Sequence, residues 1–410
     1  MTANQTLNSY QITAGLDIGN GDSKCKIKIN QQKPVYYTVP SVVAYTSGHN
    51  IPKNPTPDYL ADFVNHMEAN ISGPGIKPID EGRMFFGKRA IASGESLKLF
   101  DINNHIAKSA DSLSNILIDG ILAASALTSY FAENGKLPAN LSLNVNLAVA
   151  LPINDYLDNR DTYVNTLKQA KHLVNIRNFA NTIPVEITFN KVTVLPEGGA
   201  AQLAISTLGP KFIQGAIDLS RKQGAQIDPA YTGEMINQVM NSAIGIDIGD
   251  GTVNFPVFTN GEINGEASKT INRGYGTVLD ETVTDLQTTD ASFENRRDLS
   301  EFIKDTNNRN LPAQKEIYDT ALRAITDHKK VFARDIRVAF TDIFRKVGKR
   351  SHVIWVYGGG ATPMQDILEP VLITETKVAG NQNIPLIWMD SQYSRNLNCN
   401  GLYIAANSQQ

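Results

Sequence analysis

Cysteine is scarce in this sequence, with two residues, Cys25 and Cys399, far apart among 410. Two such cysteines cannot form the disulfide framework of a small secreted protein, and their spacing matches no zinc motif. We therefore expect both to be small apolar core residues in a chain that works in a reducing compartment. The six histidines add no metal-binding or catalytic spacing.

Long apolar runs and an excess of charge are also missing. No stretch approaches the roughly 20 apolar residues of a membrane span, and the first residues, MTANQTLNSYQ, lack the basic and apolar regions of a signal peptide. The net charge of −3 argues against strong non-specific DNA binding by the whole chain. We expect a cytoplasmic protein with no membrane partner and no direct contact with DNA.

Segments of strand length alternate with helical patterns along the whole chain. Residues 112–133 carry apolar residues at helical spacing and stop before Gly135, which favours a long buried helix. A second helix is expected over residues 156–174. Such alternation indicates an α/β protein, and 410 residues exceed one typical domain.

The sequences GLDIGNGDSKCKI and GIDIGDGTVNFPV are similar and begin 230 residues apart, at Gly15 and Gly245. Each leads from an apolar strand through a glycine turn into a second apolar stretch. A hydroxyl residue follows each turn, Ser23 in one and Thr252 in the other. The offset is too long for a solenoid repeat, so it indicates two related domains that each open with strand, turn and strand.

Each of these turns places an aspartate beside glycines, Asp17 in the first and Asp247 in the second. One such turn is weak evidence, because most glycine turns only reverse a strand. Two of them favour a polyphosphate site, since exposed backbone N–H groups of such loops bind anions. Aspartates beside phosphate need a cation between them, and Mg²⁺ suits that role. Lys24 would offset phosphate charge, unless its side chain faces the other side of the strand.

Five stretches together resemble the superfamily of actin-like ATPases, sugar kinases and heat-shock chaperones. In chain order they are DIGNGDSK (17–24), LPEGGAA (195–201), DIGDGT (247–252), VYGGGATP (356–363) and NCNGLYIAA (398–406). In that superfamily they are the first phosphate loop, the first connecting helix, the second phosphate loop, the adenosine loop and the second connecting helix. Each is weak alone, but all five occur in the family's order and span nearly the whole chain.

The resemblance implies an actin-like, two-lobed ATPase of the α/β class. Its two duplicated mixed-sheet domains, of the ribonuclease H-like type, would carry inserted subdomains around a central nucleotide cleft. The first lobe would be residues 1–196, with a small insertion at about 31–109, and the helix of 395–410 would pack back on it. The second lobe would be residues 197–394, with an insertion at about 262–350.

Within the superfamily, the first loop, PSVVA at 40–44 and INRGYGTVLDETV at 271–283 resemble the ParM/StbA group of plasmid-segregation actins. That resemblance implies an ATPase that polymerises with Mg-ATP and disassembles after hydrolysis. It further implies a filament of identical subunits and a DNA-binding adaptor of the ParR kind. The motifs do not separate ATP from GTP. The alternatives are a monomeric small-molecule kinase or phosphatase of the same superfamily, and a nucleotide-binding scaffold without significant hydrolysis.

The family's site residues transfer to matching positions of this sequence. Asp17 and Asp247 would hold Mg²⁺, and Glu197 would orient or deprotonate the attacking water. Without the resemblance, the more common explanation of Glu197 is an acid favoured by the dipole at a helix N-terminus. The expected nucleotide-binding residues are Gly19, Asn20, Gly21, Asp22, Ser23, Lys24, Gly249, Asp250, Gly251, Thr252, Gly274, Gly276, Gly358, Gly359, Gly360 and Ala361.

Overall fold

The computed structural model describes residues 9–48, 52–101, 106–378, 380 and 383–408. Contacts between residues divide the chain into two compact units. Unit 1 comprises Met1–Ala204 and Asn396–Gln410, and unit 2 comprises Ile205–Arg395. Unit 1 is therefore discontinuous, because the chain returns to it only after unit 2 is complete.

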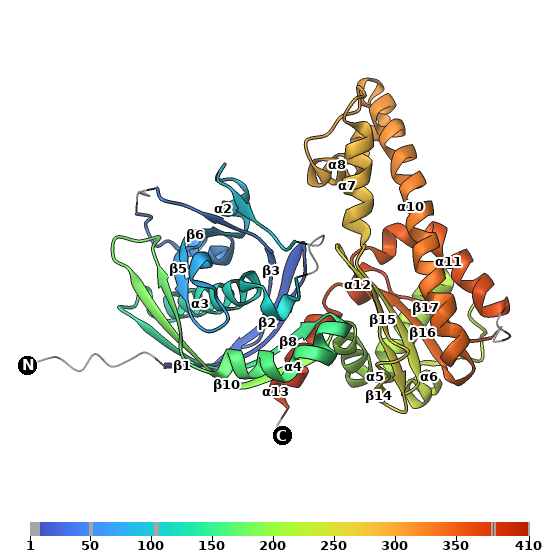
Figure 1. Ribbon diagram of the computed structural model, residues 1–410, viewed down its shortest axis with the longest axis horizontal. Coiled ribbons are helices and arrows are strands. Elements are labelled where there is room, and N and C mark those ends of the chain that lie inside the picture. Colours follow the sequence, from blue (N-terminus) through green and yellow to red (C-terminus); the bar gives the residue numbers. More distant parts are fainter. Residues whose placement is uncertain (1–8, 49–51, 102–105, 379, 381–382, 409–410) are drawn as a thin grey trace, which may run out of the picture. The chain divides into compact units, whose positions relative to one another are not determined.

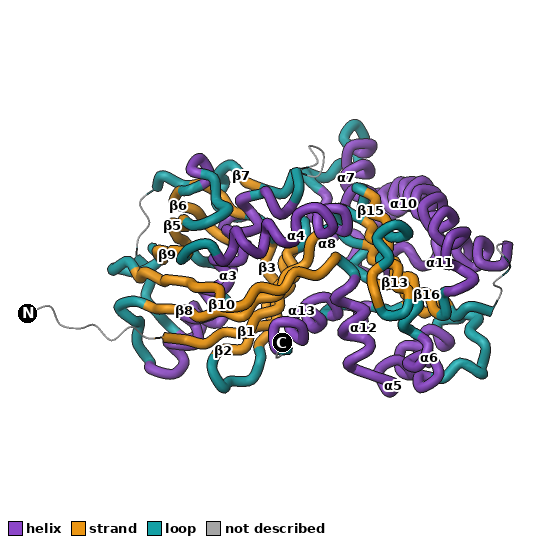
Figure 2. Tube along the Cα trace, turned by 60° about the horizontal axis from the view of Figure 1, so that its bottom comes forward, coloured by secondary structure: helices purple, strands orange, loops and turns teal. Residues whose placement is uncertain are grey.

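Unit 1 is built on a mixed sheet that has ten strands among the described residues. The order across the sheet is β3 (Val35–Pro40), β2 (Asp22–Ile29), β1 (Ser9–Ile18), β8 (Leu141–Leu151), β10 (Ile183–Pro196), β9 (His172–Ile176), β5 (Glu68–Ser72), β6 (Gly82–Phe86), β4 (Val43–Tyr45) and β7 (Leu97–Lys98). The neighbours β1, β8 and β10 run parallel, and Figure 2 shows them side by side with β2. Their carboxyl ends therefore meet at one edge of the sheet.

Short helices and two long ones complete unit 1. They are α1 (Pro57–Ala61), α2 (Gly87–Ile91), α3 (Ser112–Asn134), α4 (Ile153–Lys168), α13 (Leu397–Asn407) and the start of α5 (Gly199–Lys222), with 3-10 turns at Phe63–Asn65, Pro78–Asp80 and Lys108–Ala110. The long helix expected at 112–133 is confirmed as α3. Asp111 caps its N-terminus by accepting from the Leu113 N–H, and Gly135 ends it with a left-handed φ of 64°.

The helix predicted over 156–174 is wrong at its C-terminal end. α4 stops at Lys168, and His172–Ile176 forms strand β9 instead. The residues of β9 alternate between buried and half-buried, which is the period of a strand rather than of a helix. Pairing with β10 and β5 on its two sides then fixes the segment in the sheet.

Helix α3 is long and apolar enough, by length and composition alone, to cross a membrane. However, 89% of its most apolar window is buried inside the protein. Its residues Leu117 and Ile121 are fully buried, as are Leu143 and Val145 of β8 in the same core. We therefore assign α3 as the core helix of unit 1, because buried core helices can also be long and apolar enough to cross a membrane.

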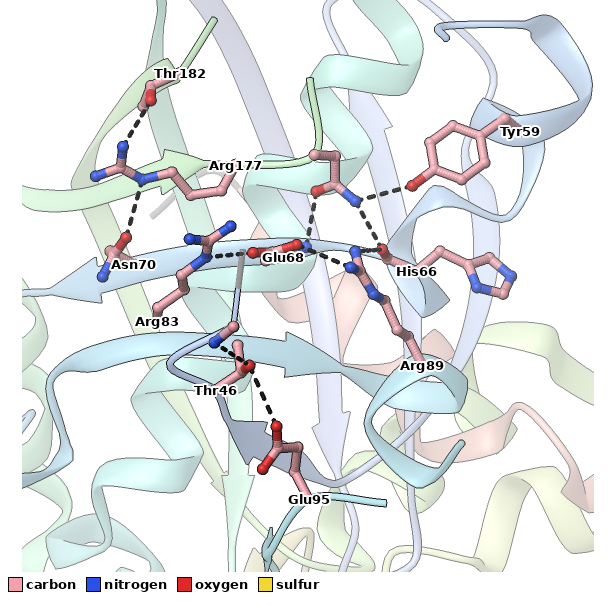
Figure 3. Close-up of polar contacts among 12 residues, drawn as sticks. Thr46, Tyr59, His66, Glu68, Asn70, Arg83, Arg89, Glu95, Arg177 and Thr182 are labelled. Carbon is pink, nitrogen blue, oxygen red and sulfur yellow. Dashed lines mark hydrogen bonds and ion pairs between the residues drawn. The ribbon is translucent and has the colours of Figure 1, made fainter. Parts of the chain in front are cut away.

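The carboxylate of Glu68 is buried beside two arginines in the outer part of the unit 1 sheet, Arg83 on β6 and Arg89 on α2 (Figure 3). Glu68, at the start of β5, is fully buried and accepts from Nε of Arg83 and from a terminal nitrogen of Arg89 at 2.9 Å. Asn178 binds the same segment by accepting from the Glu68 backbone N–H at 2.8 Å. The two guanidinium groups compensate a charge that would otherwise be costly to bury.

Unit 2 contains a second mixed sheet, with seven strands among the described residues. They are β11 (Ala243–Ile248), β12 (Val253–Phe255), β13 (Val257–Thr259), β14 (Glu262–Ile263), β15 (Lys269–Ile271), β16 (Val353–Tyr357) and β17 (Leu386–Trp388). The central strand β11 pairs antiparallel with β12 and β13 on one side and parallel with β16 on the other. Every residue of β11 and β16 is buried, as expected for strands covered on both faces.

The helices of unit 2 are α6 (Gly233–Val239), α7 (Tyr275–Leu286), α8 (Arg296–Lys304), α9 (Thr306–Asn310), α10 (Pro312–Val347), α11 (Ala361–Val378), α12 (Ser391–Ser394) and the rest of α5. Figure 1 shows α7, α8 and part of α10 extending beyond the sheet of this unit. The other end of α10 packs on the sheet through Phe332, Ile336 and Phe340, all fully buried. α5 is interrupted at Gly209, whose φ is 74° and which precedes Pro210.

Candidate functional site

The first repeated turn joins β1 to β2 in unit 1. Asp17 lies directly opposite Lys24 across this antiparallel pair, and Ile18 lies opposite Ser23. Between them the chain turns through Gly19, whose N–H donates to the Asp17 carbonyl at 3.1 Å. A Cβ on Gly19 would lie 2.6 Å from the Asp22 carbonyl oxygen, so this position requires glycine.

The segment PSVVA packs against this turn. Ser23 is fully buried, and its hydroxyl is 2.9 Å from the hydroxyl of Ser41. The Ser41 N–H donates to the Gly21 carbonyl at 2.9 Å. The turn is therefore held by backbone and hydroxyl contacts, while the side chain of Asp22 points to solvent as an exposed residue.

Asp17 lies among charged and polar groups of unit 1. Burial raises the pKa of its carboxyl, and Glu197 acts in the same direction. Lys24, Lys108 and a hydrogen bond from Asn398 act in the opposite direction. Lys24 therefore faces the same side of the sheet as Asp17, as residues directly opposite each other in a β-ladder do. Its orientation, which the sequence left open, is toward the site.

Glu197 follows the last residue of β10 and precedes the first turn of α5. Its N–H donates to the Leu151 carbonyl at the end of β8 at 2.7 Å, and its side chain is almost fully buried. Gly198, with φ 79°, redirects the chain into the helix. Because β1, β8 and β10 are adjacent and parallel, Asp17 and Glu197 lie at the same edge of the sheet.

The second repeated turn joins β11 to β12 in unit 2. The Gly249 N–H donates to the Thr252 carbonyl at 2.9 Å, and a Cβ on Gly249 would lie 3.0 Å from that oxygen. Asp247 is almost fully buried and lies opposite Asn254. Burial and the neighbouring Asp247 carboxylate raise the pKa of Tyr357 well above its ordinary value.

Three glycine segments that are distant in sequence meet at this second turn. The N–H groups of Tyr275 and Gly276 donate to the carbonyls of Gly249 and Asp250, at 2.9 and 2.8 Å. A Cβ on Gly358, whose φ is 99°, would lie 2.5 Å from the Asp247 carboxylate. The backbone segments thus pack so closely that side chains are excluded.

The other predicted residues of unit 2 lie on the same segments. The Gly360 N–H donates to the Ile248 carbonyl at 2.8 Å, and the fully buried Ala361 begins α11. Gly274 caps α7, and a Cβ there would overlap the Asp250 carbonyl. Gly359 differs, because nothing lies within 4 Å of a Cβ built on it, so its backbone faces open space.

Known proteins match this arrangement. Residues 15–199 match the family described as actin like proteins N terminal domain. No curated protein sequence matches the chain. Three solved structures match 97% of it: an archaeal actin homologue (17% identity, 99% of that chain, TM-score 0.58), Bacillus thuringiensis ParM with ATP (17%, 98%, 0.55) and the apo ParM protein of psk41 (16%, 97%, 0.51). The chain has the fold of an actin-like protein.

The predicted resemblance to ParM-type proteins and the predicted fold of two mixed-sheet domains are thereby confirmed. At 15–17% identity the solved structures establish the actin-like fold alone. The activity of this actin-like protein has to be argued from its own residues.

The carboxylates beside the two glycine turns suit a hydrated cation. One aspartate at the end of the strand precedes each turn, Asp17 on β1 and Asp247 on β11, and no group of three or more His, Cys, Asp or Glu side chains able to hold a metal occurs in the described part of the chain. Mg²⁺ keeps several waters and takes one or two carboxylates together with phosphate oxygens, rather than an all-protein cage. Each carboxylate by itself, Asp17 in unit 1 and Asp247 in unit 2, therefore has the chemistry that suits Mg²⁺ carried in with a phosphate ligand.

Sequence reasoning missed several side chains around the two turns. Lys108 donates to Glu197 at 2.6 Å, and Asn398 of α13 bonds Asp17. In unit 2, Arg296 pairs with Asp250 at 2.9 Å. These partners lie 89, 381 and 46 residues from the groups that they bind, and no local pattern marks them. Only Asn398 had a signal, since it stands in the recognised stretch NCNGLYIAA.

The two cysteines are free and buried, as expected of small core residues. Both lie near Asp17, Cys25 on β2 and Cys399 on α13. Burial, the other thiol and Asp17 raise the pKa of Cys25 well above its ordinary value, and burial with Asp17 raises that of Cys399 to about 12. Both thiols are therefore protonated and weakly nucleophilic.

Unit 2 of the actin-like chain also has an open groove of about 740 Å³ beside α11. Thr362 and Pro363 line it directly after the glycine turn, and Gln223 and Gly224 line it at the end of α5. An ion pair of 2.7 Å joins Lys329 of α10 to Asp366 of α11 on its wall. The groove extends the surface that the turn at 358–360 offers.

Proposed function

We propose that this protein is an ATPase that binds Mg-ATP, forms filaments of identical subunits and disassembles after hydrolysis. One observation carries the proposal: the same aspartate–glycine turn ends the first strand of the sheet in both units. A duplicated turn that only reversed a strand would have no reason to retain a nearly buried Asp247 in one copy and a carboxylate of raised pKa, Asp17, in the other.

The turns supply the phosphate contacts in this proposal. Backbone N–H groups within 20–23 and 250–252 would donate to the phosphate oxygens, and Lys24, which faces Asp17, would offset their negative charge. Asp17 and Asp247 would hold Mg²⁺, which neutralises charge that develops on the phosphates. The N–H groups of Gly19 and Gly249 already bond within their turns, so the residues after them are the donors.

Glu197 is the proposed residue for the attacking water. It lies at the carboxyl ends of the parallel strands, the edge where α/β sheets bind ligands. Its carboxylate accepts a hydrogen bond from the water and takes the proton as the water oxygen bonds to the γ-phosphorus. Phosphoryl transfer depends mainly on positioning and electrostatics, so one oriented carboxylate is enough to position and deprotonate the water.

The glycine turn at 358–360 is the proposed contact for adenosine. Gly359 has no neighbour within 4 Å of a Cβ position, which leaves its backbone open to a flat base or ribose. Gly274 and Gly276 pack against Asp250 and would hold α7 close to the same ligand. The Bacillus thuringiensis ParM structures were solved with ATP, ADP and AMPPNP, which supports a nucleotide here.

We further propose that the two lobes of the chain are residues 1–196 with 395–410 and residues 197–394, with inserted subdomains at about 31–109 and 262–350.

The cellular role in this proposal is drawn from the likeness to ParM. Filaments of this protein would act in the cytoplasm and move copies of a plasmid apart. A DNA-binding adaptor of the ParR kind would connect the filament to DNA, in keeping with the net charge of −3.

The test combines assembly and turnover. Light scattering and pelleting of the purified protein should rise with Mg-ATP and decline as phosphate is released. Glu197→Gln should lower phosphate release about 100-fold, the range expected for loss of a general base, while filaments persist. Glu186→Gln is the matched control, since Glu186 lies on β10, the strand that leads to Glu197, but pairs with Lys171 at the surface.

Two results would refute the proposal. Absence of assembly at high protein concentration, together with turnover that a sugar or an acid accelerates, would indicate a small-molecule kinase or phosphatase. Assembly with phosphate release that Glu197→Gln leaves unchanged would remove Glu197 from the mechanism. GTP run beside ATP decides the nucleotide preference.

A further inference from the structure

A buried ion pair joins the proposed catalytic carboxylate to a lysine. Nζ of Lys108 lies 2.6 Å from Oε1 of Glu197, and both side chains are less than a tenth exposed. At this distance the bond is a charge-assisted hydrogen bond, roughly twice as strong as a neutral one. Both residues belong to unit 1, at the edge where β1, β8 and β10 end.

Lys108 itself is firmly held. It begins the 3-10 turn Lys108–Ala110, and its carbonyl accepts from the Ser114 hydroxyl at 2.9 Å. The next residue, Ser109, donates through its N–H and its hydroxyl to Asp155 at 3.0 and 2.5 Å. The lysine ammonium also lies over the ring of Phe100, 5.7 Å from its centre. The turn thus presents the lysine in one place, as a positioned group requires.

The surrounding charges show why a cation is needed there. Glu197 and Asp17 are two carboxylates at one sheet edge, and the charge of Glu197 disfavours ionisation of Asp17. Lys24 faces Asp17, and Lys108 bonds Glu197 directly. Each carboxylate therefore has its own ammonium partner, on β2 in one case and on the turn before α3 in the other.

We propose that Lys108 is a positioning residue that fixes Glu197 in the orientation needed to receive a proton from the attacking water. This inference rests on the proposed ATPase function. In the step, the water oxygen forms a bond to the γ-phosphorus and the bond from that phosphorus to the bridging oxygen breaks. ADP leaves with the electron pair, and the water proton moves to the Glu197 carboxylate. Lys108 keeps its own protons throughout.

The experiment compares kcat, KM for ATP and nucleotide affinity in the wild type and five variants. Lys108→Met, which removes the charge and keeps the length, should lower kcat about 30-fold, within the range for general acid–base contributions. KM and the affinity for a fluorescent ATP analogue should change less than about threefold, because the lysine acts through Glu197 and does not bind the nucleotide. Lys108→Arg should recover kcat to within about fivefold of the wild type.

The double variant Lys108→Met/Glu197→Gln separates this inference from a general structural effect. If Lys108 works only through Glu197, the double variant should be no slower than Glu197→Gln alone. Lys171→Met is the matched control, since it removes a lysine from an exposed pair in the same unit. Melting curves of all variants show whether each is folded, and Lys108→Arg serves if Lys108→Met is not.

The outcomes are distinct. A wild-type protein without Mg-ATP turnover refutes the proposed function and the inference with it. Turnover that falls in Glu197→Gln but not in Lys108→Met overturns the inference alone. So does a Lys108→Met variant with raised KM and unchanged kcat, which would make the lysine a nucleotide ligand. Multiplicative losses in the double variant would also overturn it.

Discussion

Replacing Glu68 by glutamine tests whether the outer strands of unit 1 depend on one buried charge. Glu68 is fully buried between Arg83 and Arg89, whose side chains are 28% and 18% exposed. The change keeps the side-chain volume and removes the negative charge. One arginine then keeps a neutral acceptor, and the other faces the new amide NH₂ group.

The magnitude follows from these contacts. A hydrogen bond to a charged group contributes about 1.5–3 kcal/mol, and Glu68 makes one to each arginine. Water reaches both partly exposed guanidinium groups and offsets part of this loss. We therefore expect the free energy of unfolding of unit 1 to fall by about 3 kcal/mol. For a unit of this size, that corresponds to roughly 6–12 °C in the melting temperature.

The assay uses the placement of the tryptophans. Trp355 and Trp388, both fully buried in unit 2, are the only tryptophans in the sequence. Their fluorescence therefore follows unfolding of unit 2, while far-ultraviolet circular dichroism follows both units. In Glu68→Gln, the unfolding of unit 1, seen by circular dichroism, should occur at a lower denaturant concentration than the fluorescence transition of unit 2.

An exposed ion pair supplies the control. Asp161→Asn removes the carboxylate that pairs with Arg160 at the surface, and it should leave both transitions unchanged. A decrease of less than about 1 kcal/mol in the free energy of unfolding of Glu68→Gln would refute the reasoning. Glu68 would then contribute no more to stability than the carboxylate of an exposed ion pair does.

Three further predictions concern unit 1. Burial lowers the pKa of His172, but the Asp119 carboxylate outweighs burial, so the pKa of the folded protein lies above the ordinary value. The protonated pair therefore stabilises the fold fully below pH 6.5, and this contribution is lost as the pH rises through the folded pKa. Denaturant titrations at pH 6 and pH 8 should show lower stability at pH 8. Cys399, with a pKa of about 12, should resist iodoacetamide at pH 8.5 until the chain is unfolded. Gly401→Ala should destabilise unit 1 by at least about 2 kcal/mol in denaturant titrations, because its Cβ would overlap the Ala200 carbonyl.

Each of these predictions has a control. His172→Gln should abolish the difference between pH 6 and pH 8, and a difference that survives would assign it to other groups. Alkylation of native Cys399 at the rate of the unfolded chain would contradict its burial. Gly82→Ala should be nearly neutral, because a Cβ there would lie 3.4 Å from Tyr45, an ordinary contact. Equal losses in both glycine variants would refute the packing argument.

Local patterns predicted what local physics determines. The turn after β1 was predicted because alternation, an aspartate and glycines stand within a few residues, and the end of α3 because Gly135 adopts a left-handed φ. The end of α4 was misjudged, since pairing with β10 and β5 makes His172–Ile176 a strand. That pairing is a tertiary contact, which the sequence of the segment does not contain.

The candidate site was predictable only where it lies on glycine turns. Glu197 was proposed because it stands between a strand and a helix in a recognised stretch. Its partner Lys108 lies 89 residues earlier, in a segment without any motif. Side chains that meet through the fold leave no periodic signal, so the charge balance around Asp17 and Glu197 could be seen only in three dimensions.

The return of the chain to unit 1 has a consequence for biosynthesis. α13 packs against β1 and β8, and Gly15 of β1 lies so close to it that a Cβ would overlap the Tyr403 backbone. Translation proceeds at about 5–20 residues per second, so on the order of ten to forty seconds separate the end of the first segment of unit 1 from the synthesis of this helix. During that interval the nascent chain exposes the apolar patch of Ala148, Ala150 and Ala200 that Leu402 later covers. Folding of unit 1 can therefore finish only after α13 has been synthesised and has left the exit tunnel.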